Sequence, residues 1–304
     1  MSSEILATLT YHDILNCPLT AWEVFRLQIA DERHFVINDY AATLEELERL
    51  KTEGSIGEKN GFYFLKGRES LYEERIERTK TAEEKWHEVL WVLKLFPSAP
   101  FVRSAFLSGS VATGNATKGS DVDVMVVAEK GRIWTARLFL SLLVLSCGKL
   151  RATRLSKKTS GKICLNHYVT TISLGLKARG LYNAATYVRI IPIFNPEMLK
   201  KFYDANRWIF RFFPNASAEK LHQKTFPENP FFLRLRWLVE APLRGRFGDL
   251  VERGLSYVQK IFIQKNPLTQ SRIGRIVAED EELAFHPDSP EREILDKFTG
   301  KMLQ

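Results

Sequence analysis

The chain has 304 residues, of which 45% are hydrophobic, and carries a formal net charge of +8 with only three cysteines. This length exceeds the usual size of a single hydrophobic core and predicts more than one domain. Cys17, Cys147 and Cys164 are too few and too scattered for a zinc site or a disulfide framework, which favours a reducing, cytoplasmic location. Residues 1–9 lack a basic region before a long apolar core, so the sequence predicts no secretory signal.

The first 68 residues have the pattern of a small helical domain that ends in a hairpin. Helices are predicted over residues 5–15, 21–27 and 43–52. Two short strand candidates, residues 55–58 and 62–66, flank Asn60-Gly61, a strong hairpin turn. Three helices and a hairpin in this order resemble a winged helix.

The charge of the third predicted helix bears on what this domain binds. A winged helix often places its third helix in the major groove of DNA, but here that helix carries Glu45, Glu46 and Glu48. These carboxylates oppose DNA phosphate. The sequence therefore favours a protein partner or a homodimer through this domain over DNA binding.

The rest of the chain divides into three further parts. Residues 69–100 predict a linker helix that ends at two prolines, residues 101–175 a core with a mixed sheet, and residues 176–304 a mainly helical region. Within this last region, residues 176–190, 197–212, 231–264 and 290–303 have helical patterns, and the final helix is expected to pack back onto the body. The predicted fold class is mixed α+β.

The longest apolar run, residues 138–148, is well short of the roughly 20 residues that a membrane span requires. It predicts a buried helix against the sheet, and no membrane partner is expected. A cluster of basic residues follows this run: Lys149, Arg151, Arg154, Lys157, Lys158 and Lys162. Such a cluster can attract a triphosphate or a polyanionic acceptor, but it is equally typical of a solvated loop.

The most informative segment is residues 106–127, where an apolar strand, a Gly-Ser turn and a second strand follow one another. Residues two apart on a strand point to the same side, so Asp121 and Asp123 face one way together. Val122, Val124 and Val126 face the other way, toward a core. Two adjacent carboxylates repel each other, and a hard divalent cation such as Mg²⁺ removes that repulsion.

The Gly-Ser turn supplies a complementary feature. Gly109 has no Cβ, so backbone N–H groups can approach phosphate oxygens, and Ser110 is suited to cap a short following helix. Helix N-termini and backbone nests attract anions. The sequence therefore predicts a phosphate-binding turn beside the carboxylate pair.

Gly109-Ser110, ten intervening residues and then Asp121-x-Asp123 in an apolar strand resemble the signature of the DNA polymerase β-like nucleotidyltransferase superfamily, in its minimal nucleotidyltransferase branch. The resemblance implies a small mixed sheet with flanking helices, Mg²⁺ as one ion or two, and a nucleoside triphosphate, ATP above others, as donor. It also implies that Gly109 and Ser110 contact the triphosphate and that Asp121 and Asp123 are the catalytic metal ligands. The order of winged helix, transferase core and helical tail resembles bacterial proteins with such a domain.

One residue departs from the pattern of that superfamily. Its members usually carry a third acidic residue on a later strand, and the best later strand here, residues 162–171, has Asn166 at that place. Asparagine carries no charge and makes a poor general base. Alternation points His167 to the opposite face of this strand, which favours a buried, hydrogen-bonded histidine or a surface one over a role in the site.

Two main functions follow from these observations. The first is a nucleotidyltransferase that transfers a nucleoside monophosphate from ATP or another triphosphate to an unknown acceptor, with Mg²⁺ and release of pyrophosphate. The second is a catalytically degenerate nucleotide-binding or regulatory protein that uses the winged helix to engage DNA or a protein partner. Asn166 is the residue that separates them.

Overall fold

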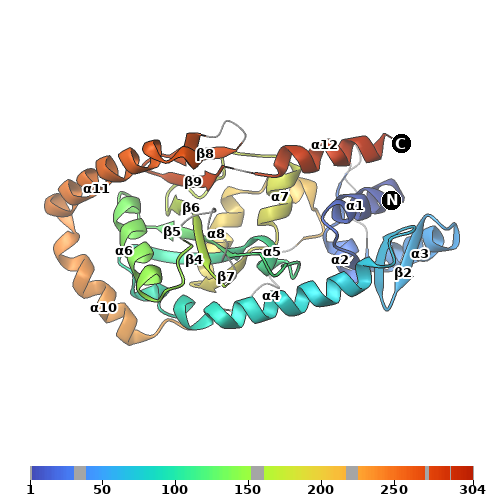
Figure 1. The fold of residues 1–304 in the computed structure, drawn as a ribbon, viewed down its shortest axis with the longest axis horizontal. Coiled ribbons are helices and arrows are strands. Elements are labelled where there is room, and N and C mark those ends of the chain that lie inside the picture. Colours follow the sequence, from blue (N-terminus) through green and yellow to red (C-terminus); the bar gives the residue numbers. More distant parts are fainter. Residues whose placement is uncertain are drawn as a thin grey trace.

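The computed structural model describes residues 2–30, 39–151, 161–216, 225–270, 274–287 and 289–303. The molecule is elongated, with the N-terminal helices at one end, a mixed sheet in the middle and a pair of helices from residues 230–265 at the other end (Figure 1). The site predicted from the sequence belongs to the middle part.

The N-terminal part contains the predicted helices and hairpin. Its elements are α1 (Ser2–Ile14), β1 (Leu19–Thr20), α2 (Ala21–Arg26), α3 (Tyr40–Thr52), β2 (Ile56–Lys59) and β3 (Phe62–Leu65). Thr20 begins α2 with a capping box, because its side chain accepts from the backbone N–H of Glu23 while the Glu23 carboxylate accepts from the N–H of Thr20. Asn60 and Gly61 both have positive φ, as the two-residue hairpin turn requires. The three strands form an antiparallel sheet in the order β1-β3-β2.

The predicted linker helix is α4 (Leu71–Leu93), which is followed by the 3₁₀ turn η1 (Phe96–Ser98). It runs from the N-terminal part to the central sheet (Figure 1). Arg78 on α4 donates to Asn115 in the loop after the Gly-Ser turn and to the carbonyl of Leu15 after α1. Helix α4 therefore joins the N-terminal part to the segment that carries the predicted site.

The central sheet has six strands in the order β7-β4-β5-β6-β9-β8. These are β4 (Val102–Ser108), β5 (Val122–Ala128), β6 (Ile163–Thr170), β7 (Ile191–Phe194), β8 (Arg275–Ala278) and β9 (Glu282–His286). Strands β5 and β6 are parallel, and the other neighbours are antiparallel. The mixed α+β class predicted from the sequence is confirmed.

Three strands of this sheet were not predicted, because β7, β8 and β9 lie beyond residue 175 in the region expected to be mainly helical. Each has only four or five residues, which is too short for a clear period-2 pattern, and each becomes a strand by pairing with a distant partner. The helix predicted over residues 176–190 is limited to α7 (Leu181–Tyr187) for the same reason, since the chain then enters β7.

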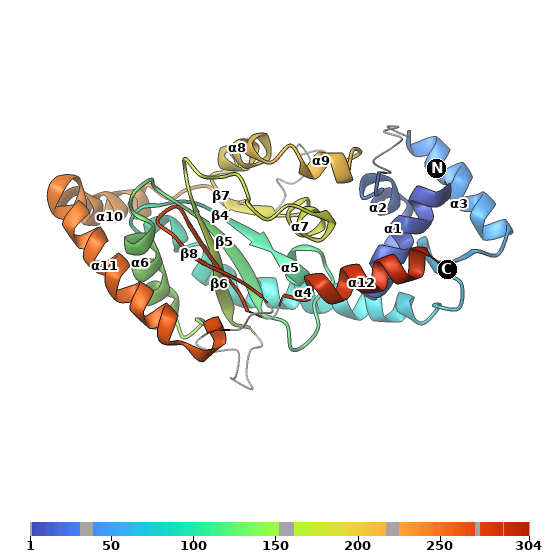
Figure 2. The same ribbon diagram turned by 90° about the horizontal axis from the view of Figure 1, so that it is seen from above.

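Helices cover both faces of the sheet. On one face, Phe106, Met125 and Val169 pack with α7, α8 (Glu197–Ala205) and α9 (Ile209–Phe212). On the other face, the side chains of Leu107 and Val124 pack with α4 and α6 (Ile133–Ser146). Figure 2 shows α8 and α9 together on one side of the sheet.

The apolar run at residues 138–148 falls within and just after α6, and the prediction of a buried helix holds for one side of it only. Leu140 and Val144 are fully buried, whereas Leu142 and Leu145 are 51% and 54% exposed. Among the described residues, no helix is long and apolar enough to cross a membrane.

The C-terminal part consists of α10 (Pro230–Glu240), the 3₁₀ turn η4 (Ala241–Leu243), α11 (Gly245–Lys265), the 3₁₀ turn η5 (Pro267–Gln270), β8, β9 and α12 (Glu291–Met302). Helix α12 returns to the N-terminal part, as predicted for the closing helix. Phe298 packs edge-on against Tyr11, and the Lys301 ammonium lies 2.7 Å from the Asp13 carboxylate.

Candidate active site

The backbone turn at Gly109 brings the end of β4 against the start of β5. Ser108 pairs with Asp123 in the antiparallel ladder, and Gly109 follows with φ +67°. A Cβ at position 109 would lie 2.5 Å from Oδ2 of Asp123. Glycine is therefore required twice here, by the left-handed backbone and by the adjacent carboxylate.

Helix α5 (Gly109–Ala112) is a single short turn, and it corrects the predicted role of Ser110 as a helix cap. The residue at the cap position is Ser108, whose side chain makes no capping hydrogen bond, and Ser110 lies inside the turn. The Ser110 carbonyl accepts from the N–H of Asn115 at 2.8 Å. Ser110 is half-buried and follows directly after the glycine that contacts Asp123.

Asp121 lies directly before β5 and Asp123 within it, and the two carboxylates lie together as the alternation predicted. Val122, Val124 and Val126 are fully buried on the α4 and α6 face. Ligand atoms of Asp121, Asp123 and Cys164 all lie within 4.8 Å of one another. Burial, reinforced by the two nearby carboxylates, raises the pKa of the Cys164 thiol, which is therefore protonated and a poor ligand for Mg²⁺.

A bulge in β6 places Asn166 at the carboxylates. Asp123 pairs with Cys164 and Met125 with His167, so Leu165 and Asn166 together lie opposite the single residue Val124. The Asn166 amide donates a hydrogen bond of 2.8 Å to Oδ1 of Asp123. An uncharged donor thus occupies the position where the resemblance leads one to expect a third carboxylate.

Arg151 is a site residue that the sequence did not single out. Its guanidinium forms an ion pair with the Asp121 carboxylate. Burial acts to lower the pKa of Arg151, but the attraction of Asp121 outweighs it and the pKa is raised. The sequence offered no sharper signal for Arg151, since it lies in a basic stretch thirty residues from its partner.

The other members of the basic cluster differ from Arg151. Lys149 pairs with Glu88 on α4 at 2.6 Å, and Lys162 donates to the carbonyl of Gly148, also at 2.6 Å. Arg154, Lys157 and Lys158 lie outside the described residues. Of the three cluster members described, only Arg151 contacts the carboxylate pair.

His167 faces away from the site, as alternation predicted. It is fully buried, with Nδ1 2.7 Å from the Tyr187 hydroxyl and Nε2 3.2 Å from the Glu282 carboxylate. Burial lowers its pKa. The interpretation of His167 as a buried, hydrogen-bonded histidine is confirmed.

The donor set at Asp121 and Asp123 fits a hard divalent cation. Carboxylate oxygens are the ligands that such a cation prefers, and those of Asp121 and Asp123 lie within 4.8 Å of each other. The amide of Asn166 can also turn its oxygen toward a cation. Binding through Asp121 would require Arg151 to give up that carboxylate.

A cavity of about 460 Å³ opens beside these residues, between α6, β6, α11 and the β8–β9 hairpin. Arg151, Cys164 and Asn166 line it on the side of the carboxylates. Most of the remaining lining is apolar: Leu138, Leu150, Leu165, Phe262, Ile263, Ile276, Phe285 and Pro287. The cavity can therefore hold a small molecule with one end at Arg151 and Asn166, the two residues that contact the carboxylates.

Arg137 is the second cation of this cavity. Its guanidinium lies 5.1 Å from the Phe285 ring centre and donates to Gln259, and burial lowers its pKa. Among the described residues, no carboxylate pairs with Arg137. The Arg137 guanidinium thus lies in the wall of a cavity whose lining is mostly apolar.

Comparison with known proteins gives one positive result. Residues 91–161 match the family model described as nucleotidyltransferase domain. No curated protein and no solved structure matches the chain significantly. The matched segment contains Gly109, Ser110, Asp121, Asp123 and Arg151 but ends before β6, so Asn166 lies outside it. The chain thus contains a nucleotidyltransferase domain of the polymerase β-like type at residues 91–161.

Proposed function

We propose that this protein is a Mg²⁺-dependent nucleotidyltransferase that transfers a nucleoside monophosphate from a nucleoside triphosphate, ATP above others, to an acceptor hydroxyl. The observation that carries the proposal is the close approach of the Gly109 backbone to Asp123, which places the Gly-Ser turn beside the carboxylate pair inside the matched domain. The acceptor oxygen forms a bond to the α-phosphorus as its hydroxyl proton passes to solvent, the bond from the α-phosphorus to the bridging oxygen breaks, and pyrophosphate leaves with that electron pair.

Each residue of the candidate site would have a role in binding phosphate or metal that follows from its charge. Backbone N–H groups at Gly109 and Ser110 hold the triphosphate, because the glycine lets phosphate oxygens approach the turn. Asp121 and Asp123 would hold Mg²⁺, which supplies charge neutralisation at the transferring phosphoryl group. Asn166 orients Asp123 by its hydrogen bond but cannot accept the proton of the acceptor.

Arg151 has two roles in this proposal. Without nucleotide it pairs with Asp121 and reduces the repulsion between the two carboxylates. With Asp121 engaged as a metal ligand, the Arg151 guanidinium would be free to bind a phosphate oxygen of the donor. Most of the rate would then come from positioning and electrostatic stabilisation.

The acceptor is proposed to bind in the 460 Å³ cavity. This space adjoins Arg151 and Asn166, and its apolar walls with Arg137 at one side favour a molecule with an apolar body and an anionic group.

A test of the donor site is calorimetry of each nucleoside triphosphate with and without Mg²⁺, on the native protein and on Asp121→Asn/Asp123→Asn. Binding that needs Mg²⁺ and is lost in the variant supports the proposal. The control is Glu197→Gln/Asp204→Asn, which changes two exposed acids of α8 and should leave binding intact. A folded native protein that binds no triphosphate would refute the donor site.

A catalytically degenerate nucleotide-binding protein is the second candidate, and one observation favours it. Both carboxylates already have partners within the chain, Arg151 for Asp121 and Asn166 for Asp123. This candidate predicts triphosphate binding without pyrophosphate release. Measuring both quantities on the same native sample separates the two candidates.

For the N-terminal part, residues 1–68, we propose a winged-helix-like domain that engages a protein partner or a second copy in preference to DNA. Trp22, Phe25 and Tyr40 form an aromatic cluster on α2 and α3, with Trp22 40% exposed. On α3, Arg49 and Lys51 pair with Glu46 and Glu48 of the same helix. Duplex affinity that falls steeply with salt would overturn this proposal.

A further inference from the structure

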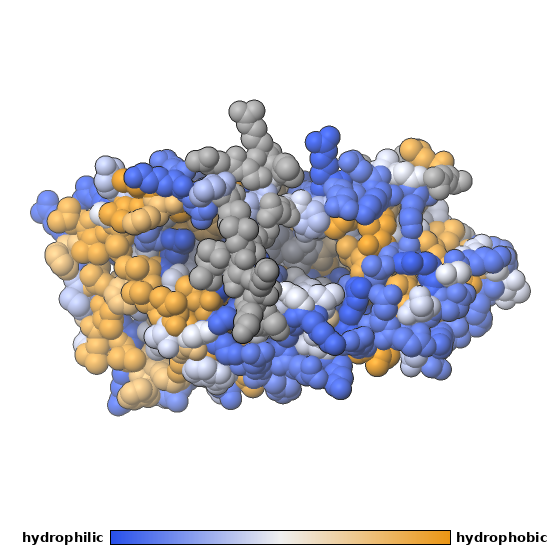
Figure 3. Space-filling model, viewed as in Figure 1, coloured by the Kyte–Doolittle hydropathy of each residue, from blue (hydrophilic) through white to orange (hydrophobic). Residues whose placement is uncertain are grey.

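Helices α10 and α11 present many large apolar side chains to solvent. We call this set the arm face, and it comprises Phe231, Leu235, Trp237, Leu238, Phe247, Leu250, Tyr257, Val258 and Phe262. Phe231, Trp237, Tyr257 and Phe262 are each more than 60% exposed. Figure 3 shows hydrophobic residues gathered at the end of the molecule where these helices lie. A concentration of this size marks an interaction site.

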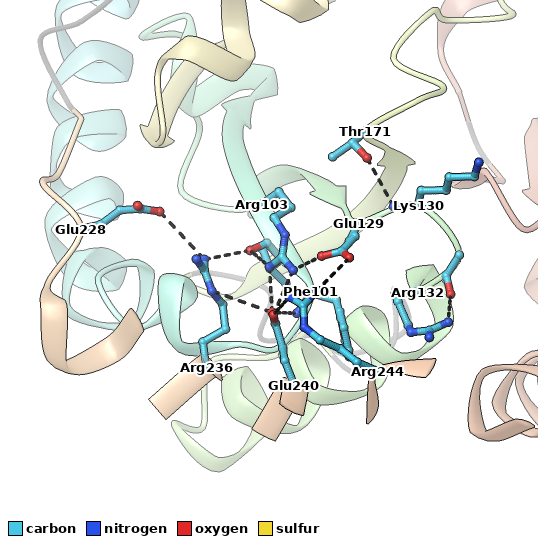
Figure 4. A network of polar contacts seen from close by, with 12 residues as sticks. Phe101, Arg103, Glu129, Lys130, Arg132, Thr171, Glu228, Arg236, Glu240 and Arg244 are labelled. Carbon is cyan, nitrogen blue, oxygen red and sulfur yellow. Dashed lines mark hydrogen bonds and ion pairs between the residues drawn. The ribbon is translucent and has the colours of Figure 1, made fainter. Parts of the chain in front are cut away.

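The inner sides of both helices are already occupied. Figure 4 shows Glu240 of α10 among Arg103, Arg244 and Phe101. The Glu240 carboxylate is 4% exposed and accepts from Arg103 at 2.7 Å, from Arg244 at 2.8 Å and from the N–H of Phe101 at 2.7 Å. This network fixes α10 to the start of β4.

Helix α11 is fixed by a second buried acid. Glu252 accepts from the backbone N–H groups of Trp134 and Thr135 at 2.8 and 3.0 Å, so it caps the start of α6. Gln259 lies two turns further along the same side of α11. Its side-chain amide donates to the carbonyl of Trp134 at 2.9 Å. Since these buried groups hold the inner side in place, the arm face stays directed to solvent.

A row of cations borders the arm face. Arg246, Arg253 and Lys260 recur at seven-residue steps on α11 and so lie along one side of the helix, next to the stripe of Phe247, Leu250 and Tyr257. Residues 230–265 contain seven Lys and Arg against three acidic residues. Arg236 and Arg244 pair with the buried Glu240, and Lys260 pairs with Asp280 at 2.8 Å, so Arg246 and Arg253 are the members of the row without an ion pair among the described residues. The outer surface is therefore apolar and cationic together.

This combination fits a bilayer surface better than it fits the alternatives. Aromatic and aliphatic side chains beside a row of Lys and Arg are typical of helices that lie in the headgroup region of an anionic membrane. In a symmetric dimer, Arg246 and Arg253 of both copies would adjoin the same buried interface, and Asp249, the one exposed acid of α10 and α11, already pairs with Arg132. Nucleic acid would stack on aromatic rings but would leave Leu235, Leu238 and Leu250 without apolar partners.

We propose that the arm face docks the protein peripherally on a membrane that contains anionic lipid. The apolar stripe enters the headgroup region while Arg246 and Arg253 contact lipid phosphates. Phe262 belongs both to the arm face and to the lining of the 460 Å³ cavity, so docking would bring that cavity toward the bilayer. The proposal does not depend on the transfer reaction.

The test is co-sedimentation of the full chain with vesicles of phosphatidylcholine alone and with mixed phosphatidylcholine–phosphatidylglycerol vesicles. The native protein is expected to bind the mixed vesicles preferentially. Phe247→Ser/Leu250→Ser/Tyr257→Ser should lower the vesicle partition coefficient by roughly 100-fold or more. Arg246→Gln/Arg253→Gln should lower it by roughly 30-fold on mixed vesicles and hardly at all on neutral ones.

Matched control variants remove exposed apolar or cationic side chains outside the arm face. Ile76→Ser/Ile172→Ser removes two apolar side chains that are 48% and 56% exposed, and Arg207→Gln/Arg292→Gln removes two exposed cations. Both controls should bind vesicles like the native protein, and all variants should retain the native circular dichroism. The proposal is overturned if the native chain stays in the supernatant with both vesicles at low salt, or if the controls lose binding as much as the arm-face variants. A dimer in light scattering that the triple arm-face variant dissociates would overturn it in favour of self-association.

Discussion

The acids in two regions of this molecule are surrounded very differently. Glu240 and Glu252, on the inner sides of α10 and α11, each accept several hydrogen bonds from partners that lie beside them in the fold. Asp121 and Asp123 lie next to each other, with Asp121 paired to Arg151 and Asp123 accepting from Asn166. The first two acids complete the structure, whereas the second two bring carboxylate oxygens together at one place, as a bound cation requires.

The difference teaches how to separate structural from functional acids in a protein of this kind. When a buried carboxylate has its charge compensated by neighbouring groups, neutralising that carboxylate lowers the stability of the protein. Two adjacent carboxylates repel each other and so lower stability in the absence of a cation, and their neutralisation affects function first. The predictions below test this distinction.

The largest effect is expected at the carboxylate pair. Asp123→Ala should lower Mg²⁺-dependent pyrophosphate release by roughly 10³-fold, because it removes a charge aimed at the transferring phosphoryl group. The melting temperature should change little, because the lost hydrogen bond from Asn166 is offset by relief of the repulsion between Asp121 and Asp123. Asp204→Ala, at an acid whose side chain is 69% exposed, is the control. Equal loss of activity in both variants would remove the special role of Asp123.

The second largest effect is expected on the free energy of unfolding. Glu240→Gln should lower the free energy of unfolding by about 3 kcal/mol, since Arg103 and Arg244 lose a buried charged partner. Glu279→Gln breaks a surface pair with Lys177 and should cost at most about 1 kcal/mol. Urea unfolding of both variants measures the difference, and similar values would show that the network of Glu240 adds little.

A pair of glycines sharpens the comparison at the site. Gly109 and Gly131 both have φ +67°, but a Cβ at 131 would meet nothing within 4 Å, whereas one at 109 would meet Asp123. Gly131→Ala should cost about 1–2 kcal/mol of stability from the backbone alone. Gly109→Ala should cost more and should also weaken Mg²⁺-dependent nucleotide binding. If both variants bind nucleotide equally well, the contact with Asp123 has no part in the donor site.

Asn166→Asp tests the missing third carboxylate. An aspartate at 166 would replace the amide that donates to Asp123, adding a negative charge to the cluster. Affinity for Mg²⁺ should rise by about tenfold, while the protein without metal should become less stable. Isothermal titration with Mg²⁺ and thermal melting in a chelator measure these two quantities. Activity that appears only in this variant would favour the degenerate candidate.

The smallest effect is expected on the pH dependence of stability, from His12, which is buried in its neutral form. Burial lowers the pKa of His12 from 6.5 to about 3, and its Nδ1 lies 2.9 Å from the carbonyl of Thr8. The unfolded chain therefore binds a proton that the folded chain does not, and stability present above pH 6.5 is lost as the pH falls toward 3. The loss from this group should be about 1.4 kcal/mol at pH 5.5 compared with pH 8.

His12→Asn keeps a donor near the Thr8 carbonyl and removes the titration. The difference in unfolding free energy between native protein and variant should then depend on pH with this sign. A difference that is constant from pH 8 to pH 5.5 would contradict the assignment.

Half of the candidate site was visible in the sequence. Gly109, Asp121 and Asp123 lie within fifteen residues, and strand alternation together with a glycine turn was enough to bring them together. Arg151 was not predicted as a site residue, because its ion pair depends on where the chain between α6 and β6 passes the end of β5. Asn166 was identified as the departure from the family pattern, but its hydrogen bond to Asp123 results from a bulge that no local pattern announced.

The sequence by itself determined the local elements whose signals lie within a few residues. These are the Thr20 capping box, the Asn60-Gly61 hairpin, the long helix α4 and the two strands of the carboxylate motif. Short-range hydrogen bonding and the periods of helix and strand are sufficient for them.

Only the tertiary structure decided the extent of the sheet and the outer surface of the C-terminal helices. Strands β7, β8 and β9 exist through pairing with β4, β6 and each other, at separations of many tens of residues in the first two cases. The apolar residues of α10 and α11 have the pattern of a core, but Glu240 and Glu252 take the inner positions and leave many of those residues exposed. A helical pattern shows that a helix has distinct sides, and long-range contacts then decide which side is buried.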